Sequence, residues 1–80
     1  MEFDYSRLRG RIRELDMRID DCADAAGISR SAFSLKINGH YGFKQEEILA
    51  VCDVLGIPVE QIYLYFFQIK KKGDRRKRSP

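Results

Sequence analysis

The chain has 80 residues, two cysteines, one histidine and a formal net charge of +3. A chain of this length forms one small domain, and two cysteines do not make a disulfide framework. Its longest apolar run, residues 62–67, is too short to cross a membrane, and the sequence shows no secretory signal. We therefore expect a soluble intracellular protein with no membrane or secretory role.

The charge is unevenly distributed along the chain. Residues 1–69 carry eight basic and eleven acidic side chains, a net charge of −3, whereas residues 70–80 carry seven basic side chains and one acid. Contact of the folded part with a nucleic acid would therefore require a local positive face. We predict a folded domain over residues 1–69 and a disordered basic tail over residues 70–80, which has no apolar residue to bury.

The first half of the chain predicts three short helices from apolar residues at helical spacing. The first covers residues 5–15 and the second residues 19–26. Gly27 can take the left-handed conformation that ends the second helix. Ser29 can cap a third helix over residues 30–38, so only a tight turn separates the second and third helices.

The second half predicts two more helices. A loop over residues 40–43 precedes a fourth helix over residues 45–55, and Pro58 suits the first turn of a fifth. Over residues 64–69 the aromatic and β-branched side chains suit a helix or a short C-terminal strand, and both remain open. The fold class expected is an all-α compact bundle of about five short helices.

The second and third predicted helices carry the functional signal. Ala23 is small enough for the next helix to approach, Gly27 makes the turn, and Ile28 fills the angle between the helices. Phe33 and Ile37, four residues apart, then anchor the third helix to the core. Its opposite face presents mostly small or hydrogen-bonding side chains, which suit a DNA major groove: Arg30, Ser31, Ser34, Leu35 and Asn38.

Together with Asn38-Gly39, Phe43 and residues 55–58 and 66–67, this pattern resembles the Cro and phage-repressor helix-turn-helix family. It is similar to small repressors of phages of low-GC Gram-positive bacteria, and the resemblance covers about residues 5–67. The resemblance implies a lambda-repressor-like DNA-binding domain whose third helix enters the major groove of an operator. It implies no cofactor, no metal and no small-molecule substrate.

The resemblance also implies which residues contact DNA. Arg30, Ser31 and Leu35 would read base edges, and Ser34 lies on the same face. Phosphate contacts would fall on Asn38, on the start of the second helix and on the loop after the third. In and beside that loop the candidates are His40, Tyr41 and Lys44, for which an ordinary loop role remains the alternative.

Three features depart from the family pattern. Arg18 and Ile19 stand where many members have a Thr cap and a phosphate-binding Gln. Ile12 and Ile37 replace an Arg–Glu pair that often joins the first and third helices. Lys36 stands where an inward aliphatic residue is common, which leaves the rotation of the third helix open by about one position.

Four arginines alternate along the first predicted helix. We expect some of them to pair with acids such as Asp4 and Asp16, and a phosphate contact by one of them is the alternative. These arginines are Arg7, Arg9, Arg11 and Arg13.

Other chemistry-bearing residues have ordinary explanations. Asp20, Asp21 and Asp24 could be taken for metal ligands by number alone, but acids are favoured in the first turn of a helix. Cys22 and Cys52 fall on inward helical faces and are expected in the core. No nucleophile with a base and no phosphate-binding loop is present, so we predict no catalytic residue and no enzyme.

These observations predict sequence-specific binding of double-stranded DNA by a transcriptional regulator of the phage-repressor or Cro type. It would act in the cytoplasm of a prokaryotic cell or phage-infected host. The alternative is a protein-interaction module on the same fold, such as a phage antirepressor or an antitoxin-like partner. The net negative charge of residues 1–69 and the missing phosphate-binding Gln favour that alternative.

A homodimer is also predicted, through residues 62–69. This segment has more large apolar side chains than one helix or strand can bury against a small core. A two-fold contact would cover the excess on both chains at once. In the alternative, the aromatic side chains fold back over the first and fourth helices of a monomer.

Overall fold

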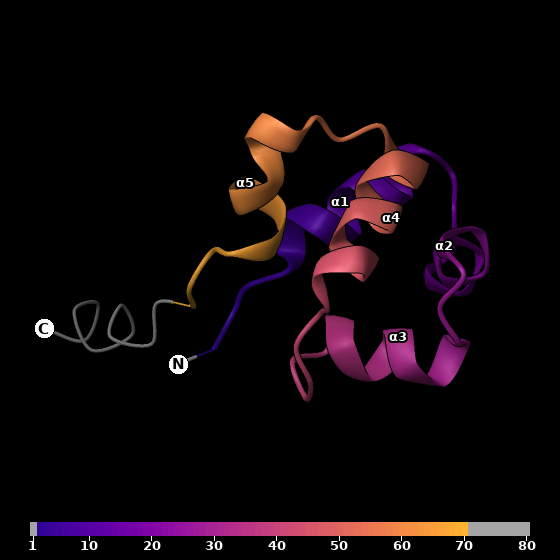
Figure 1. The fold of residues 1–80 in the computed structure, drawn as a ribbon, viewed down its shortest axis with the longest axis horizontal. Coiled ribbons are helices and arrows are strands. Elements are labelled where there is room, and N and C mark those ends of the chain that lie inside the picture. Colours follow the sequence, from indigo (N-terminus) through magenta and orange to yellow (C-terminus); the bar gives the residue numbers. More distant parts are fainter. Residues whose placement is uncertain (1, 71–80) are drawn as a thin grey trace, which may run out of the picture.

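Five α-helices enclose one core in the computed structural model, which describes residues 2–70 (Figure 1). They are α1 (Ser6–Glu14), α2 (Ile19–Ala26), α3 (Arg30–Ile37), α4 (Gln45–Leu55) and α5 (Ile62–Phe66), and the 3-10 helix η1 (Val59–Gln61) leads into α5. Within residues 2–70 no strand forms, and one isolated antiparallel bridge joins Phe3 to Ile69. The predicted all-α fold is confirmed.

The predicted helices correspond closely to those observed. The second and fourth have the predicted bounds, the first is one residue shorter at each end, and the third ends at Ile37 with Asn38 as its cap. Over residues 64–69, which suited either structure, the chain is helical to Phe66 and then bridges to the N-terminal segment at Ile69.

The turn between α2 and α3 follows from two residues. Gly27 has a φ of 76°, which a side chain would disfavour, and it ends α2. The Ser29 hydroxyl accepts a hydrogen bond of 3.2 Å from the Ala32 amide at the start of α3. Both predicted signals are confirmed, and together they lead the chain from α2 into α3 within three residues.

Aromatic rings tie the segment after α3 to the rest of the core. The ring of Phe43 makes edge contacts with Tyr5, Phe33 and Phe66, at centroid distances of 5.5, 5.7 and 5.3 Å. Pairs of this kind contribute about 0.5–1.5 kcal/mol each beyond the area they bury. Because these rings come from the start of the chain, α3 and α5, Phe43 holds the end of α3 against the other helices.

The two ends of the described chain lie side by side (Figure 1). The Asp4 amide donates to the Gln68 carbonyl at 2.6 Å, and the Lys70 amide donates to the Glu2 carbonyl at 2.8 Å. Apart from Lys70, the predicted basic tail over residues 70–80 lies outside the described residues.

In the described part of the chain, no single helix is long and apolar enough to cross a membrane. By length and composition alone α4 passes that test together with Val59–Phe66, but the two helices are bent by 112° relative to each other. In this structure α4 contributes four buried side chains to the core: Ile48, Val51, Cys52 and Leu55.

Candidate nucleic-acid interface

The α2–α3 pair has the helix-turn-helix arrangement that the sequence predicts. Ala23 is fully buried and Ile28 is nearly so, at the angle between the helices. Phe33 and Ile37 are buried in the core, as expected of the anchoring face of α3. The opposite face of α3 is therefore the outer surface of the motif.

All eight predicted contact residues lie on that outer surface or on the segment after α3. Ser34 is half-buried and the others are exposed, including Leu35 at 41% and Tyr41 at 63%. The Asn38 amide group donates to the Ser34 hydroxyl at 3.4 Å, which links the last turn of α3 to its cap. The predicted contact residues are thus exposed or half-buried side chains of α3 and of the segment that follows it: Arg30, Ser31, Ser34, Leu35, Asn38, His40, Tyr41 and Lys44.

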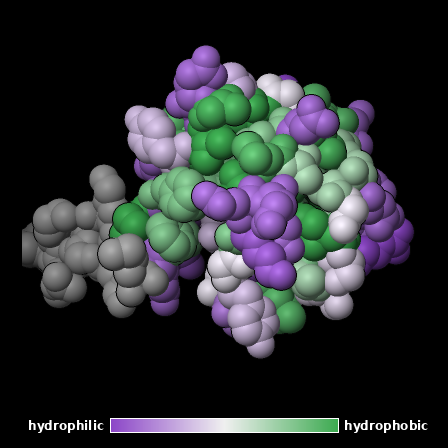
Figure 2. Space-filling view, in the orientation of Figure 1, coloured by the Kyte–Doolittle hydropathy of each residue, from purple (hydrophilic) through white to green (hydrophobic). Residues whose placement is uncertain are grey.

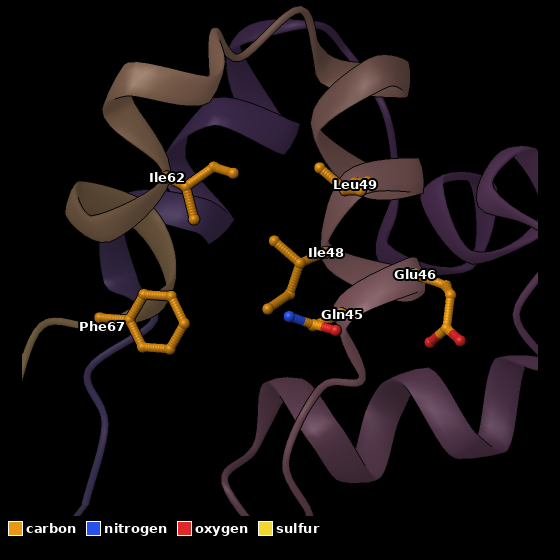
Figure 3. Close-up of a pocket in the computed structure, with 6 residues that line it drawn as sticks. All are labelled: Gln45, Glu46, Ile48, Leu49, Ile62 and Phe67. Atoms are coloured by element: carbon orange, nitrogen blue, oxygen red, sulfur yellow. The ribbon is translucent and has the colours of Figure 1, made fainter.

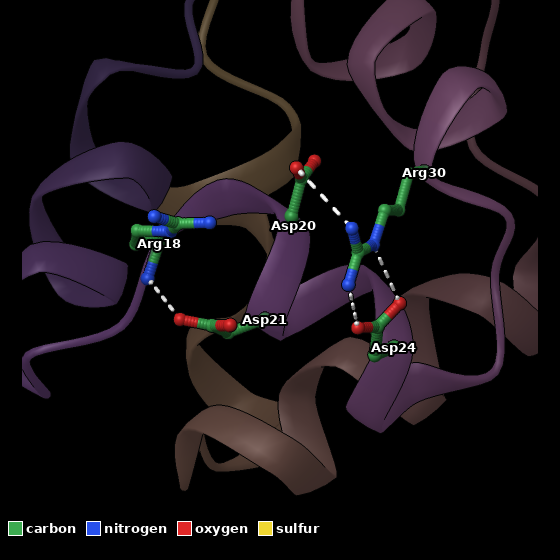
Figure 4. Close-up of polar contacts among 5 residues, drawn as sticks. All are labelled: Arg18, Asp20, Asp21, Asp24 and Arg30. Carbon is green, nitrogen blue, oxygen red and sulfur yellow. Dashed lines mark hydrogen bonds and ion pairs between the residues drawn. The ribbon is translucent and has the colours of Figure 1, made fainter.

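Arg30, the predicted guanine contact, is held by carboxylates of α2 (Figure 4). Its Nη2 and Nε atoms donate to the two carboxylate oxygens of Asp24 at 2.7 and 3.1 Å, and its Nη1 lies 3.9 Å from Asp20. The hydrogen bonds from Arg30 lower the pKa of Asp24, and those to Asp24 raise the pKa of Arg30. The guanidinium charge is therefore balanced within the motif itself.

The third acid of α2 has a separate role. The Asp21 carboxylate accepts a hydrogen bond of 2.9 Å from the Arg18 amide, which stabilises the start of the helix (Figure 4). With Asp20 it places two acids in the first turn of α2, where the family pattern has a phosphate contact.

Lys36, whose orientation the sequence left open, points toward the start of α4. Its Nζ donates to both oxygens of Glu47 at 2.6 Å, and the two side chains are only 12% and 18% exposed. Glu47 also accepts from the Lys44 amide at 2.8 Å. Burial disfavours the charged carboxylate, but these hydrogen bonds outweigh it and hold the pKa of Glu47 below its ordinary value. Both basic residues of α3 are thus paired with acids.

Arg9 makes a contact between α1 and α3 that the sequence did not predict. Its Nη2 donates to the Asn38 side-chain oxygen at 2.5 Å and to the Ile37 carbonyl at 3.4 Å. This contact joins the same two helices as the Arg–Glu pair of the family, whose positions here hold the buried residues Ile12 and Ile37. Arg9 and Arg11 both donate to backbone carbonyls of other helices, and sequence periodicity carries no signal for such contacts.

As expected, an arginine of α1 pairs with an acid, but within residues 2–70 that acid is Glu14 and neither Asp4 nor Asp16. Asp4 instead accepts a hydrogen bond of 2.9 Å from the Ser6 amide at the start of α1. Arg11 pairs with Glu14 at 3.1 Å and donates to the Leu55 carbonyl at 2.9 Å. The Asp4 carboxylate thus caps the start of α1, and Arg11 binds the carbonyl at the end of α4.

The surface of the motif can hydrogen-bond, but it has little free positive charge. Its chemistry suits recognition rather than catalysis. Over residues 2–70 no three His, Cys, Asp or Glu side chains are placed to hold a metal ion. Cys22 and Cys52 are buried, as predicted from their inward positions.

The fold and its helix-turn-helix are those of a small regulator of phage repression. The solution structure of the modulator of repression (MOR) of the temperate bacteriophage TP901-1 from Lactococcus lactis matches with a TM-score of 0.72 and 39% identity. The match covers 84% of this chain and 90% of that chain, and the two proteins are homologous.

The chain belongs to the family described as Protein of unknown function (DUF739), whose model matches residues 1–69. No curated protein matches the chain. The prediction of a phage regulator is confirmed at the level of this homology.

Proposed function

We propose that this chain modulates repression in a phage genetic switch by binding the repressor protein of that switch, as an antirepressor-type module. The name of its homologue supports this proposal, because a modulator of repression acts on repression that another molecule exerts. The observation that carries the proposal is the pairing of both basic residues of α3, Arg30 and Lys36, with carboxylates.

Electrostatics favours a protein partner over DNA. Affinity for DNA depends mainly on Lys and Arg side chains that are free to neutralise phosphates. Here Asp20 and Asp21 occupy the first turn of α2, and residues 1–69 carry a net charge of −3. Such a surface repels phosphate, but it complements the positive face with which a repressor contacts its operator.

A binding assay with labelled DNA tests the proposal. The duplex is the DNA flanking the gene of this protein, and a scrambled duplex is the control. We expect the chain alone to show no preference between the two duplexes, and any binding through the basic residues 70–80 to weaken with salt equally for both. Added to the complex of that duplex with the repressor of the switch, it should change the amount of repressor bound. Tight, sequence-specific and salt-dependent binding by the chain alone would contradict the proposal.

Direct DNA binding with α3 in the major groove is the second candidate function. The exposed polar side chains of α3 favour it, and the pair of Arg30 and Asp24 is solvent-exposed, so a guanine could displace the carboxylate. In that case Arg30→Ala would weaken specific binding by about tenfold or more while leaving non-specific binding unchanged. An unchanged specific affinity would exclude this orientation of α3.

Self-association remains a prediction from the sequence. In the structure Tyr63, Phe67 and Ile69 are between 44% and 59% exposed, so the segment over residues 62–69 keeps apolar surface available. Sedimentation at micromolar concentration, with Phe67→Asp as the probe, measures whether two copies pair through it.

A further inference from the structure

An open apolar groove lies between α4 and the α5 segment (Figure 3). Ile48 and Leu49 of α4 line one side, Ile62 and Phe67 line the other, and Gln45 lies at its end. Glu46 also borders the groove, with its carboxylate directed away from Ile62 and Phe67 in Figure 3. Its volume is about 440 Å³, within the usual range of binding pockets. None of its lining residues belongs to α2 or α3, so the groove is a surface separate from the helix-turn-helix motif.

Large apolar side chains around this groove are exposed to solvent. Leu49 is 53% exposed, Tyr63 59% and Phe67 48%. Figure 2 shows apolar side chains gathered over α4 and α5, with hydrophilic side chains around them. Contiguous apolar surface of this kind marks an interaction site more often than chance exposure.

All charged side chains of residues 45–69, the stretch that lines the groove, are acidic, and Lys44 and Lys70 flank this stretch in the sequence. Residues 45–69 contain no Lys, Arg or His, and within residues 2–70 the carboxylates of Glu46, Asp53 and Glu60 form no ion pair. Glu46 and Asp53 lie one helical turn before and after Leu49, on the same face of α4. Glu60 lies in η1, just before Ile62. Exposed carboxylates therefore flank the apolar surface.

Neither the C-terminal residues 71–80 nor a second copy of the chain fits an apolar groove flanked by carboxylates. Residues 71–80 are strongly basic but contain no apolar residue to fill the groove. A two-fold contact between copies would place the carboxylates of both chains near one another with no basic side chain from residues 45–69 between them. The arginine-rich helix α1 of a second copy cannot fill the groove, because its apolar residues Leu8 and Ile12 are buried in its own core.

We infer that the groove binds an amphipathic helix of a partner protein. Apolar side chains on one face of that helix contact Leu49, Ile62 and Phe67, and Lys or Arg side chains beside them pair with Glu46, Asp53 and Glu60. The inference rests on the proposed function in requiring a protein partner, and it adds where that partner binds and which chemistry it presents.

The test uses the full chain labelled with ¹⁵N and two synthetic peptides of about fifteen residues. Both peptides have leucines at helical spacing along one face; lysines occupy the other positions in one peptide and glutamates in the other. We expect the lysine peptide to shift the amide signals of α4, η1 and α5, and to bind at least about tenfold more tightly than the glutamate peptide. Equal affinities, or shifts centred on α3, would overturn the inference.

Matched variants separate the groove from general acidity. Leu49→Ser and Glu46→Lys should each weaken binding of the lysine peptide by about tenfold. Leu35→Ser removes a leucine of similar exposure from α3, and Glu14→Lys reverses an exposed charge on α1, so both should leave binding unchanged. Equal losses in the groove and control variants would mean that the peptide follows overall charge and would overturn the inference.

Three further outcomes are informative. A dimer in sedimentation that Leu49→Ser dissociates would assign the groove to a second copy and overturn the inference. If the lysine peptide binds in the groove but the chain leaves the repressor–DNA complex unchanged, the groove is retained and the proposed function fails. If the repressor–DNA complex responds and the peptide does not bind, the groove assignment fails and the proposed function is retained.

Discussion

The α2–α3 face and the α4–α5 face of this molecule use their charges in opposite ways. On α2–α3, Arg30 is held by Asp24 and Asp20, and Lys36 is held by Glu47. On α4–α5, by contrast, exposed apolar side chains lie beside carboxylates that have no cationic partner within residues 2–70.

This contrast separates architecture from function. The helix-turn-helix places α3 on the surface as it does in DNA-binding proteins, but the functional outcome depends on which side chains remain free to bind. Here the basic side chains of α3 are paired with carboxylates of α2 and α4, while an apolar groove stays open between α4 and the α5 segment. The groove is therefore as strong a candidate for partner contact as the recognition helix.

The largest expected effect comes from the pair of Lys36 and Glu47, which joins the two regions. Glu47→Gln would leave a nearly buried ammonium group without its counter-charge. We expect the free energy of unfolding to fall by about 2–3 kcal/mol, somewhat less than for a fully buried pair. Urea denaturation measures this loss of stability. The control is Glu46→Gln, which makes the same change at an exposed neighbouring residue. Equal losses of unfolding free energy in both variants would mean that the ion pair of Lys36 and Glu47 does not stabilise the contact between α3 and α4.

A second variant tests whether internal pairing suppresses DNA binding. Asp20→Asn combined with Asp24→Asn frees Arg30 and removes two negative charges from α2. We expect affinity for duplex DNA to rise by about tenfold at low salt. Asp53→Asn with Glu46→Gln makes the same change in charge on the other face and should raise it much less. Equal gains would show that only net charge matters.

The pH dependence of stability tests Glu47 in a different way. Its pKa in the folded chain lies below the ordinary value of 4.5. Its contribution is therefore complete above pH 4.5 and is lost as the pH falls through the lower folded value. Wild-type stability should fall more steeply below pH 4.5 than that of Glu47→Gln, since other carboxylates affect both proteins alike. Parallel curves would contradict this assignment.

Local signals explain why most of the fold could be predicted from the sequence. Gly27 and Ser29 define the turn into α3, and α4 has its predicted bounds. Residues 64–69 were ambiguous because aromatic side chains suit either structure. Distant contacts decide there, since Phe66 enters the core and Ile69 bridges to Phe3.

The candidate site was predictable in position but not in electrostatics. Phe33 and Ile37 define the inner face of α3 and hence its outer face. The partner of Arg30 depends on how closely α2 crosses α3, and Glu47 lies eleven residues from Lys36 in the next helix. Helical spacing does put Asp20 and Asp24 on one face of α2, and this was the available signal for the pairing.

The smallest effect, equal labelling rates, is expected for two buried cysteines, one in each region. Cys22 lies in α2 and Cys52 in α4, two helices that pack against each other. Burial raises the pKa of Cys22 to about 11 and also raises that of Cys52, so neither thiol forms much reactive thiolate in the folded state. Iodoacetamide should therefore label both only when the chain opens. Because the two helices share one core, we expect Cys22 and Cys52 to be labelled at equal rates in mild denaturant. Mass spectrometry of the two cysteine-containing peptides measures these rates, which are corrected for the rates in the fully unfolded chain. Faster labelling of Cys22 would mean that the helix-turn-helix opens independently of α4, and that the two faces belong to separate cooperative units.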